Sequence, residues 1–274
     1  MKWWASAASE TQITHGQRLW LYCLAVIIMC LLVVPTVIVI PMSFSDSQYL
    51  EFPPQTWSLR WYHEYLDTPR WMNATVTSFK VASLTMLVAT PFGTMAAYGL
   101  FVSGSRLGKM VFFMLMTPMI VPVILIAIGT FYVFGKLGLV NSILGLVLAH
   151  TVLSVPIVMI IITAALRTYD LNQERVAQSL GSTRLRAFFE ITLPQLKFSI
   201  LTAALLAFLT SFDEVIISIF LSGAGNSTLT KQMFSALRDY IDPTIAAIST
   251  LMILLSSGLM LGLHFIGDKD SQGD

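Results

Sequence analysis

The chain has 274 residues, of which 55% are hydrophobic and only 11% are charged. Soluble globular domains carry about a quarter charged residues, so this composition excludes an ordinary soluble protein and predicts an integral membrane protein. The formal net charge of +1 argues neither for nor against nucleic acid. Because the basic residues are concentrated in the predicted loops on one side of a membrane, and do not form a separate basic region, we expect no nucleic-acid partner.

The first long apolar run, residues 19–41, predicts a membrane-spanning helix. A bilayer core about 30 Å thick needs roughly 20 apolar residues in a helix, and no charged residue interrupts this run. It is too long for the apolar part of a signal peptide and lacks a small-residue cleavage site. Residues 1–18 are then expected to be a cytoplasmic tail. Cys23 and Cys30 lie seven positions apart within the run, too far for one disulfide along a helix.

The segment that follows, residues 42–71, is predicted to be a periplasmic loop. It carries Trp57, Trp61 and Tyr65 at helical spacing, and Ser58 is available as a helix cap. Trp and Tyr favour the depth of lipid headgroups, so these residues fit an interfacial anchor. A docking surface for an external partner is the second interpretation, and the sequence leaves both open.

Five further apolar runs follow, and they predict a five-helix membrane core over residues 72–266. The runs are residues 72–102, 111–134, 142–166, 199–221 and 244–266. The total of six spans predicts an all-α membrane protein whose two ends lie on the same side. Residues 267–274 are then a second cytoplasmic tail.

The orientation follows from the distribution of Lys and Arg, which are enriched in cytoplasmic loops. Ten of the sixteen Lys and Arg residues fall on the side of the two ends, five fall on the other side, and Lys80 lies within the second run. Both ends and the loop of residues 167–198 are therefore predicted to be cytoplasmic.

Prolines are scattered through the predicted spans, at Pro35, Pro91, Pro118, Pro122 and Pro156. Each frees a backbone carbonyl that neighbouring helices or an aqueous path must satisfy. Small residues at Gly93, Ala96 and Ala97 predict close helix packing. Broken, closely packed helices suit a transporter that moves, although static bundles share these features.

The loop of residues 167–198 is polar and charged, and it predicts two short amphipathic helices. Asp170 with Gln173 forms a capping-box pattern, Gly181 stands where a left-handed residue ends a helix, and Ser182 or Thr183 can cap the second helix. A solvated connector is one interpretation of this loop. Docking of its narrow stripe of small apolar residues into the groove of another protein is the other.

At these residues a resemblance becomes specific. The run ERVAQSLGS, followed by ITLP, resembles the EAA loop of type I ABC importer permeases. The matching residues are Glu174, Ala177, Leu180, Gly181, Ile191, Leu193 and Pro194. Arg175 and Val176 depart from the Glu and Ala of the family pattern. The resemblance extends over most of the chain, from about residue 73 to residue 266.

The resemblance implies a type I ABC importer permease fold in a bacterial inner membrane, with residues 172–190 as the segment that couples to a cytoplasmic ATPase. The implied coupling residues are Glu174, Ala177, Gln178, Leu180, Gly181 and Ser182. ATP and Mg²⁺ would be bound by the ATPase, and this chain would hold no cofactor. The implied partners are two ATPase subunits, a second and different permease chain, a periplasmic substrate-binding protein and membrane lipid.

Charged residues inside the predicted spans mark a second candidate site. Asp213 and Glu214 lie roughly 22 Å from the cytoplasmic face by helical rise, and charges at such depth favour a functional interpretation. Lys80 and His150 reach a comparable depth. Lys80 or His150 could pair with an acid and stabilise the bundle. Alternatively, a carboxylate faces the translocation pathway and favours a cationic solute.

The stretch SFDEVIISIFLSGAG around these acids resembles the spermidine/putrescine-type subfamily of permeases. This resemblance implies that the solute is a polyamine delivered by an external binding protein. Relatives of that subfamily carry other small solutes, including opines and phosphonates, and these remain alternatives.

Motifs for other functions are absent from the sequence. It contains no G-x-x-x-x-G-K-[ST] phosphate loop, no nucleophile elbow and no cluster with metal-ligand spacing, so we expect no catalytic residue, no metal site and no enzyme activity in this chain. The remaining alternative is an ion-coupled secondary transporter with Asp213, Glu214 and His150 as a proton relay. Many secondary transporters are built from inverted repeats, and no inverted repeat can be recognised in the six predicted spans. The ion-coupled alternative is therefore less favoured.

Overall fold

The computed structural model describes residues 14–271, and their regular secondary structure is helical apart from one isolated bridge between Ser45 and Trp57. The all-α prediction is therefore confirmed for this part of the chain. Of the predicted tails, residues 1–13 and 272–274 lie outside the described residues, whereas residues 267–271 continue the last helix, which ends at Ser271. The described residues divide into two compact units, which are taken in turn.

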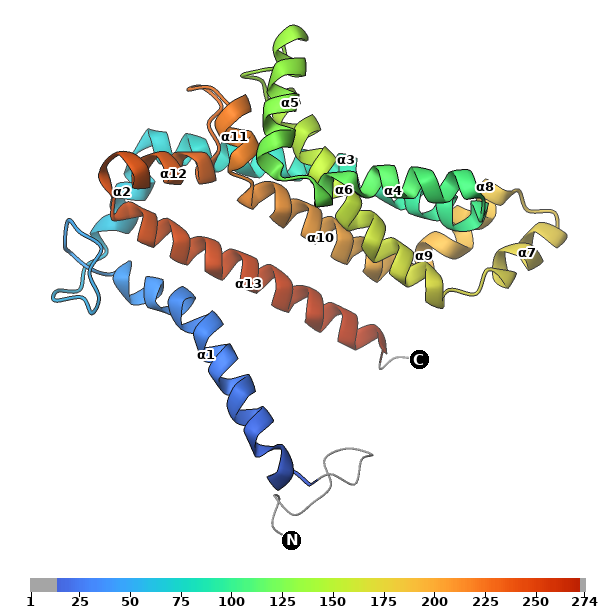
Figure 1. Cartoon of the computed structure of the whole chain (residues 1–274), viewed down its shortest axis with the longest axis horizontal. Coiled ribbons are helices and arrows are strands. Elements are labelled where there is room, and N and C mark those ends of the chain that lie inside the picture. The colour runs from blue at the N-terminus through green and yellow to red at the C-terminus, as the bar shows by residue number, and fades with distance from the viewer. Residues whose placement is uncertain (1–13, 272–274) are drawn as a thin grey trace. The chain divides into compact units, whose positions relative to one another are not determined.

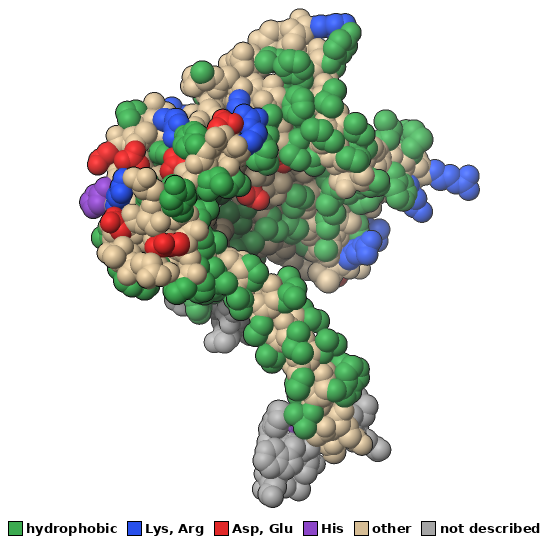
Figure 2. All heavy atoms as spheres, turned by 60° about the vertical axis from the view of Figure 1, so that its left-hand side comes forward, with side chains coloured by type: hydrophobic (Ala, Val, Ile, Leu, Met, Phe, Trp, Pro, Cys, Tyr) green, Lys and Arg blue, Asp and Glu red, His purple; other side chains and the backbone are tan. Residues whose placement is uncertain are grey.

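The first unit contains the described residues up to Tyr65 together with Ile241–Met252. Its main element is α1 (Leu19–Met42), preceded by the 3₁₀ turn η2 (Gly16–Arg18). No residue of α1 is buried, and Figure 2 shows apolar side chains all along this helix. Because its surface is apolar along its whole length, α1 suits lipid or another transmembrane helix as its surroundings. Pro35 and Pro41 lie inside the helix without breaking it.

The loop after α1 is folded around aromatic side chains. The Phe44 ring packs against the rings of Trp57 and Tyr62, with centroids 6.3 and 5.3 Å apart. Ser58 Oγ accepts a hydrogen bond from the Arg60 amide at 3.1 Å, so it caps α2 (Arg60–Asp67) as predicted. Trp61 and Tyr65 are buried, which leaves only Trp57 of the three predicted anchors with an exposed ring.

The core of the second unit is formed by α3 (Pro69–Ser103), α6 (Ile143–Thr168) and α10 (Lys197–Asp213), which run alongside one another in Figure 1. Their contact is lined by small residues. A Cβ added at Gly93 would come within 2.6 Å of the Val158 side chain, and Ala97 is also buried. The predicted small-residue seam is therefore the place where α3 meets α6.

Two of the predicted continuous spans are broken. The run of residues 111–134 is divided into α4 (Arg106–Ile120) and α5 (Val123–Lys136), which are bent by 103°; Figure 1 shows α5 turning away from α4. Pro122 sits at the break and Val121 before it is extended, as the steric demands of proline require. Likewise, the run of residues 199–221 is divided into α10 and α11 (Ile216–Leu221).

The spans can now be counted for residues 14–271. Four unbroken helical stretches are long and apolar enough to cross a bilayer, namely Gly16–Met42, Pro69–Ser103, Ile143–Thr168 and Thr244–Leu263. Two bent pairs, Arg106–Ile120 with Val123–Lys136 and Arg184–Gln195 with Lys197–Asp213, bring the number to six if each pair is one span. The prediction of six spans holds only with these bends included.

Short helices connect the spans. The polar loop contains α7 (Asn172–Ser179), α8 (Arg184–Ala187), the π-helical turn η3 (Phe188–Thr192) and α9 (Leu193–Gln195). On the opposite side of the spans, α12 (Leu229–Tyr240) precedes α13 (Thr244–Ser271). The two short helices predicted for the loop are thus present as α7 and α8.

Candidate functional site

The turn between α7 and α8 is set by Gly181. Its φ of +95° is in the left-handed region, where a side chain is strained. The Gly181 amide donates to the Gln178 carbonyl and the Ser182 amide donates to the Ala177 carbonyl, both at 3.0 Å. This pair of bonds is a Schellman motif and ends α7, as the sequence predicts.

The two helix starts differ from each other. Thr183 Oγ1 accepts from the Arg186 amide at 3.3 Å and caps α8. Asp170 Oδ1 accepts from the Asn172 amide at 2.9 Å, but the Gln173 side chain does not return to Asp170 and instead accepts from Gln195 Nε2 at 2.5 Å. The N-cap of α7 is Leu171, which makes no side-chain cap bond. The predicted capping box with Asp170 at the N-cap is therefore wrong in both halves, because the Asp170 side chain binds the Asn172 amide and α9 offers the Gln173 side chain a nearer partner.

Glu174 points into the molecule and is only 3% exposed. The Tyr98 hydroxyl of α3 donates to Glu174 Oε2 at 2.7 Å, and Thr192 Oγ1 donates to Oε1. Tyr169 joins this network through its hydroxyl, 3.0 Å from Thr192 Oγ1. The first coupling residue implied by the resemblance is thus an internal tether that joins α7 to α3 and η3, and it offers no surface to a partner.

The Tyr169 hydroxyl lies just beyond the end of α6. Burial raises its pKa above the usual range, and the nearby carboxylates of Glu174 and Asp170 raise it further, while the bond to Thr192 acts in the opposite direction. The phenol therefore stays neutral near pH 7 and keeps its hydrogen for the network.

The outward face of the loop is apolar. Leu180 is 83% exposed, and Val176, Leu185 and Phe189 are each more than half exposed. We call these four residues the apolar loop surface. Gln178 and Gly181 lie beside it in the chain, and Ala177 and Ser182 complete the set of implied coupling residues. Large exposed apolar side chains on a polar loop are a feature that contacts between proteins commonly use.

The second candidate site is the break between α10 and α11. Asp213 is the last residue of α10, and Glu214 is extended with φ −72° and ψ 114°. Glu214 Oε1 accepts from the Ile217 amide at 2.9 Å and so caps α11, while its carbonyl accepts from the hydroxyls of Ser218 and Thr230. Asp213 is exposed and has no hydrogen bond or ion pair within residues 14–271.

His150 fastens this break to α6. It is only 1% exposed, with Nδ1 at 2.8 Å from Ser211 Oγ of α10 and Nε2 at 3.4 Å from Ser218 Oγ of α11. These partners are hydroxyls and not the acids considered from the sequence. Both nitrogens of His150 face serines inside the bundle. A role for His150 in the translocation pathway stays a prediction.

Lys80 also lacks the acid partner considered for it. The side chain is exposed on α3, in a shallow groove formed with Phe79, Ser83, Leu84 and Ile143. It makes no ion pair within the described part of the chain. The structure therefore brings His150 to the break but does not pair Lys80 with Asp213 or Glu214.

The start of α12 is held against α3 beside the break. Ser78 Oγ accepts from the Leu229 amide at 2.8 Å, and Lys231 Nζ donates to the Ser222 carbonyl at 2.6 Å. Burial lowers the pKa of Lys231.

The serine partners of His150, like Tyr98 and Thr192, could not be found from the sequence, because each lies 18 to 76 positions from the residue it contacts.

With both sites defined, the chain can be compared with known proteins. The sequence profile of the family described as "Binding-protein-dependent transport system inner membrane component" matches residues 89–268, which contain both the loop and the break. The chain belongs to this family. It is a permease component of an ABC importer and a multi-pass inner-membrane protein.

Among the relatives of this permease is the putrescine transport system permease protein PotI of Escherichia coli (strain K12). It is 34% identical over 204 residues, which cover 72% of this chain and 73% of the relative. The spermidine/putrescine transport system permease protein PotC of Haemophilus influenzae (strain ATCC 51907 / DSM 11121 / KW20 / Rd) is 27% identical over 241 residues, covering 88% of this chain and 93% of the relative. The resemblance to the spermidine/putrescine-type subfamily is thus confirmed.

Solved structures share the fold of the permease at much lower sequence identity. A chain of a bacterial ABC transporter involved in the import of the acidic polysaccharide alginate superimposes with a TM-score of 0.72 at 12% identity, covering 93% of this chain and 96% of that chain. A second alginate transporter structure, in complex with an alginate pentasaccharide-bound periplasmic protein, gives a TM-score of 0.70 at 14% identity. The type I importer permease fold is therefore confirmed.

Proposed function

We propose that the permease forms half of an ATP-driven pathway for a polyamine such as putrescine or spermidine. The observation that carries this proposal is the similarity to PotI and PotC, whose names state those solutes. A polyamine is a flexible cation, and Asp213 offers an unpartnered carboxylate at a break in a spanning helix. Such a group attracts a cation without a fixed ion pair that would first have to be broken.

The apolar loop surface is the proposed contact with the ATPase. Closure of two ATPase subunits on ATP and Mg²⁺ would move α7 and α8 as one piece, because Gly181 joins them through a short hydrogen-bonded turn. Glu174 would pass this movement to α3 through the Tyr98 hydroxyl. The chain itself then supplies a docking surface and a tether, and ATP chemistry takes place in the partner.

Two further partners belong to the proposal. A second, different permease chain would form the other half of the pathway. A periplasmic binding protein would deliver the solute. The second alginate transporter structure contains a periplasmic protein in its complex, which supports this kind of partner.

Crosslinking tests the coupling contact. Cys23 and Cys30 are exposed in α1, so both are first replaced by Ser, and Gln178→Cys is then introduced beside Leu180. We expect a crosslink to a cysteine in the groove of the ATPase subunit. Arg238→Cys, an exposed position in α12 on the opposite side of the spans, is the control and should give none. An assembled, active complex that fails to link through Gln178→Cys would remove the coupling assignment.

Uptake into vesicles tests the energy source and the solute. With ATP present and the proton gradient collapsed, we expect accumulation of radiolabelled putrescine. Uptake that follows the proton gradient and ignores ATP would favour the ion-coupled alternative with Asp213, Glu214 and His150. Competition by an opine or a phosphonate, without competition by spermidine, would reassign the solute but keep the permease role.

A further inference from the structure

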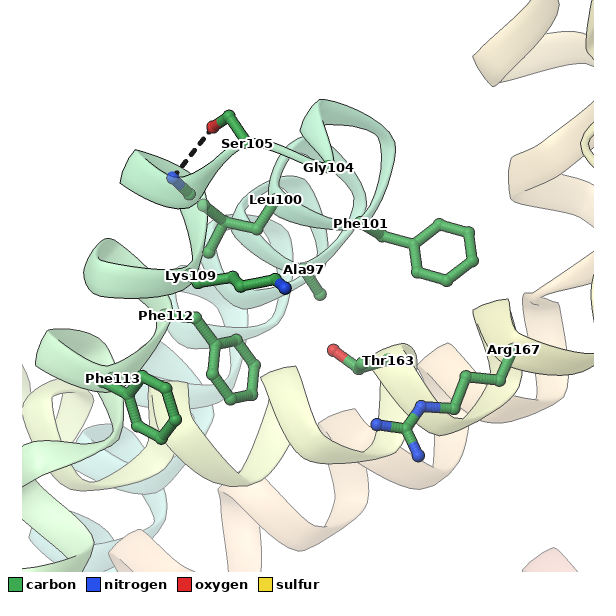
Figure 3. Close-up of a pocket in the computed structure, with 11 residues that line it drawn as sticks. Ala97, Leu100, Phe101, Gly104, Ser105, Lys109, Phe112, Phe113, Thr163 and Arg167 are labelled. Atoms are coloured by element: carbon green, nitrogen blue, oxygen red, sulfur yellow. Dashed lines mark hydrogen bonds between the residues drawn. The ribbon is translucent and has the colours of Figure 1, made fainter.

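A cavity of about 450 Å³ lies where the end of α3, the start of α4 and the end of α6 meet. It is separate from the loop tether and from the break at Asp213. Figure 3 shows Lys109, Thr163 and Arg167 around one opening, with Phe101 and Phe112 at its sides. Its position at the ends of three spanning helices places it at the surface that the Lys and Arg distribution predicts to be cytoplasmic.

The charge in this cavity is entirely positive. Lys109 and Arg167 line it, and none of its lining residues is acidic. Both side chains are exposed, and neither forms an ion pair or hydrogen bond within residues 14–271. The cavity therefore presents two cations without a counter-charge, a few residues from the predicted membrane surface.

The rest of the lining is mostly apolar, and Leu100, Phe101, Phe112 and Phe113 form most of the wall. Two hydroxyls interrupt it. That of Ser105 accepts from the Gly108 amide at 2.9 Å, whereas Thr163 Oγ1 is buried without a hydrogen-bond partner. An unsatisfied buried hydroxyl in a native protein calls for a polar ligand group or a water. A soluble anion would use the cations and this hydroxyl but would leave the aromatic wall exposed.

We propose that this cavity binds an anionic phospholipid of the cytoplasmic leaflet. The phosphate lies between Lys109 and Arg167 and accepts a hydrogen bond from Thr163, and the first part of one acyl chain packs along Leu100, Phe101 and Phe112. This ligand satisfies all three features of the cavity: its charge, its buried hydroxyl and its aromatic wall. Basic pockets between spanning helices on the cytoplasmic side bind such headgroups in other membrane proteins.

Photolabelling of the assembled transporter tests the proposal. The probe is phosphatidylglycerol with a diazirine near the start of one acyl chain, and labelled peptides are mapped by mass spectrometry. We expect label within residues 97–113 and 163–167. Unlabelled phosphatidylglycerol should displace it, whereas equal amounts of phosphatidylcholine or glycerol 3-phosphate should not.

Three variants test which side chains of the cavity contribute to lipid binding. Lys109→Gln and Arg167→Gln should each reduce labelling about five-fold, since each removes one cation near an anionic headgroup. Thr163→Val keeps the shape, removes the hydroxyl and should give a loss of about three-fold. Arg106→Gln is the matched control, because Arg106 is exposed on the same first turn of α4 but does not line the cavity; its labelling should stay within about two-fold of the wild type.

Several results would overturn the proposal. Equal competition by phosphatidylcholine would show that the phosphate charge is not recognised, and equal competition by glycerol 3-phosphate would assign the cavity to a soluble phosphate. Label elsewhere in an assembled transporter would show that another subunit covers this face. Each single variant is checked for assembly by size-exclusion chromatography, so that a correctly assembled variant with wild-type labelling also counts against the site.

Discussion

The polar loop and the break at Asp213–Glu214 both interrupt membrane helices, but they arrange their side chains in opposite ways. In the loop the acid Glu174 is buried among hydroxyls, and the apolar residues Leu180 and Val176 are exposed. At the break the acid Asp213 is exposed, and His150 is buried among hydroxyls. Polarity in the sequence therefore does not tell which group is available to a partner; the packing around each group decides this.

The largest expected effect tests the exposed side of the loop. Leu180→Asp places a charge in the proposed ATPase contact, where burial of an unpaired carboxylate replaces burial of a leucine. We expect ATP-driven uptake to fall about 100-fold at low ATPase concentration, with the melting temperature of the permease unchanged because Leu180 is 83% exposed. Uptake in vesicles and thermal unfolding are measured in parallel. A large drop in melting temperature would place Leu180 in the fold and not in the contact.

The next effect tests the buried side of the same loop. Glu174→Ala leaves the Tyr98 and Thr192 hydroxyls without their shared acceptor, and we expect a loss of stability of about 2 kcal/mol. Its matched control is Glu190→Ala, because Glu190 is exposed and paired only with Arg186 at 2.9 Å; exposed pairs contribute less than about 1 kcal/mol. Thermal unfolding compares the two variants. Equal melting temperatures would contradict the internal tether.

A smaller effect is expected at the exposed acid of the break. Asp213→Asn removes the charge but no described hydrogen bond, so putrescine uptake should fall about ten-fold, equal to roughly 1.4 kcal/mol, while assembly stays intact. Glu214→Gln removes the charge but keeps an oxygen that can accept from the Ile217 amide. Glu214→Ala removes both the charge and the cap, so the two variants together separate these contributions. Normal transport by both Asp213→Asn and Glu214→Gln would exclude a role for these charges in the pathway.

The smallest effect concerns the buried histidine. Ser211→Ala removes the hydroxyl 2.8 Å from His150 Nδ1, and loss of one buried hydrogen bond should cost about 1 kcal/mol. Thermal unfolding measures the loss, and Ser257→Ala at an exposed position of α13 is the control, because the Ser257 side chain makes no hydrogen bond within the described residues. If Ser211→Ala keeps its stability but loses transport, the result would indicate that His150 acts in the translocation pathway.

Much of the fold could be predicted from the sequence because it follows from local patterns. Apolar runs, the Lys and Arg distribution, the left-handed Gly181 and the caps at Ser58 and Thr183 depend only on neighbouring residues. The resemblance to the permease family likewise starts from short local patterns, in the polar loop and around Asp213 and Glu214. These predictions concern which elements exist and where they end.

The remaining features depend on contacts between distant segments. The sequence names five prolines at which a helix could be broken, but it does not tell that Pro122 lies at a bend while Pro91 and Pro156 lie inside unbroken helices. Whether a proline breaks a helix depends on what satisfies the freed carbonyl. The tether of Glu174 and the serine partners of His150 likewise join residues that only the packed bundle brings together.

The apolar surface of α1 has a consequence for biosynthesis. Of the spanning helices within residues 14–271 this one is synthesised before the others, and it is unbroken over Leu19–Met42 although it contains Pro35 and Pro41. It can therefore enter the bilayer before any later segment exists. The bent pair of α4 and α5 has no such independence, because the carbonyls at its break need neighbouring groups. An unbroken helix such as α1 can thus anchor the growing polypeptide, whereas the bent pair needs a neighbouring helix, such as α6 packed against α4, before it is stable in the bilayer.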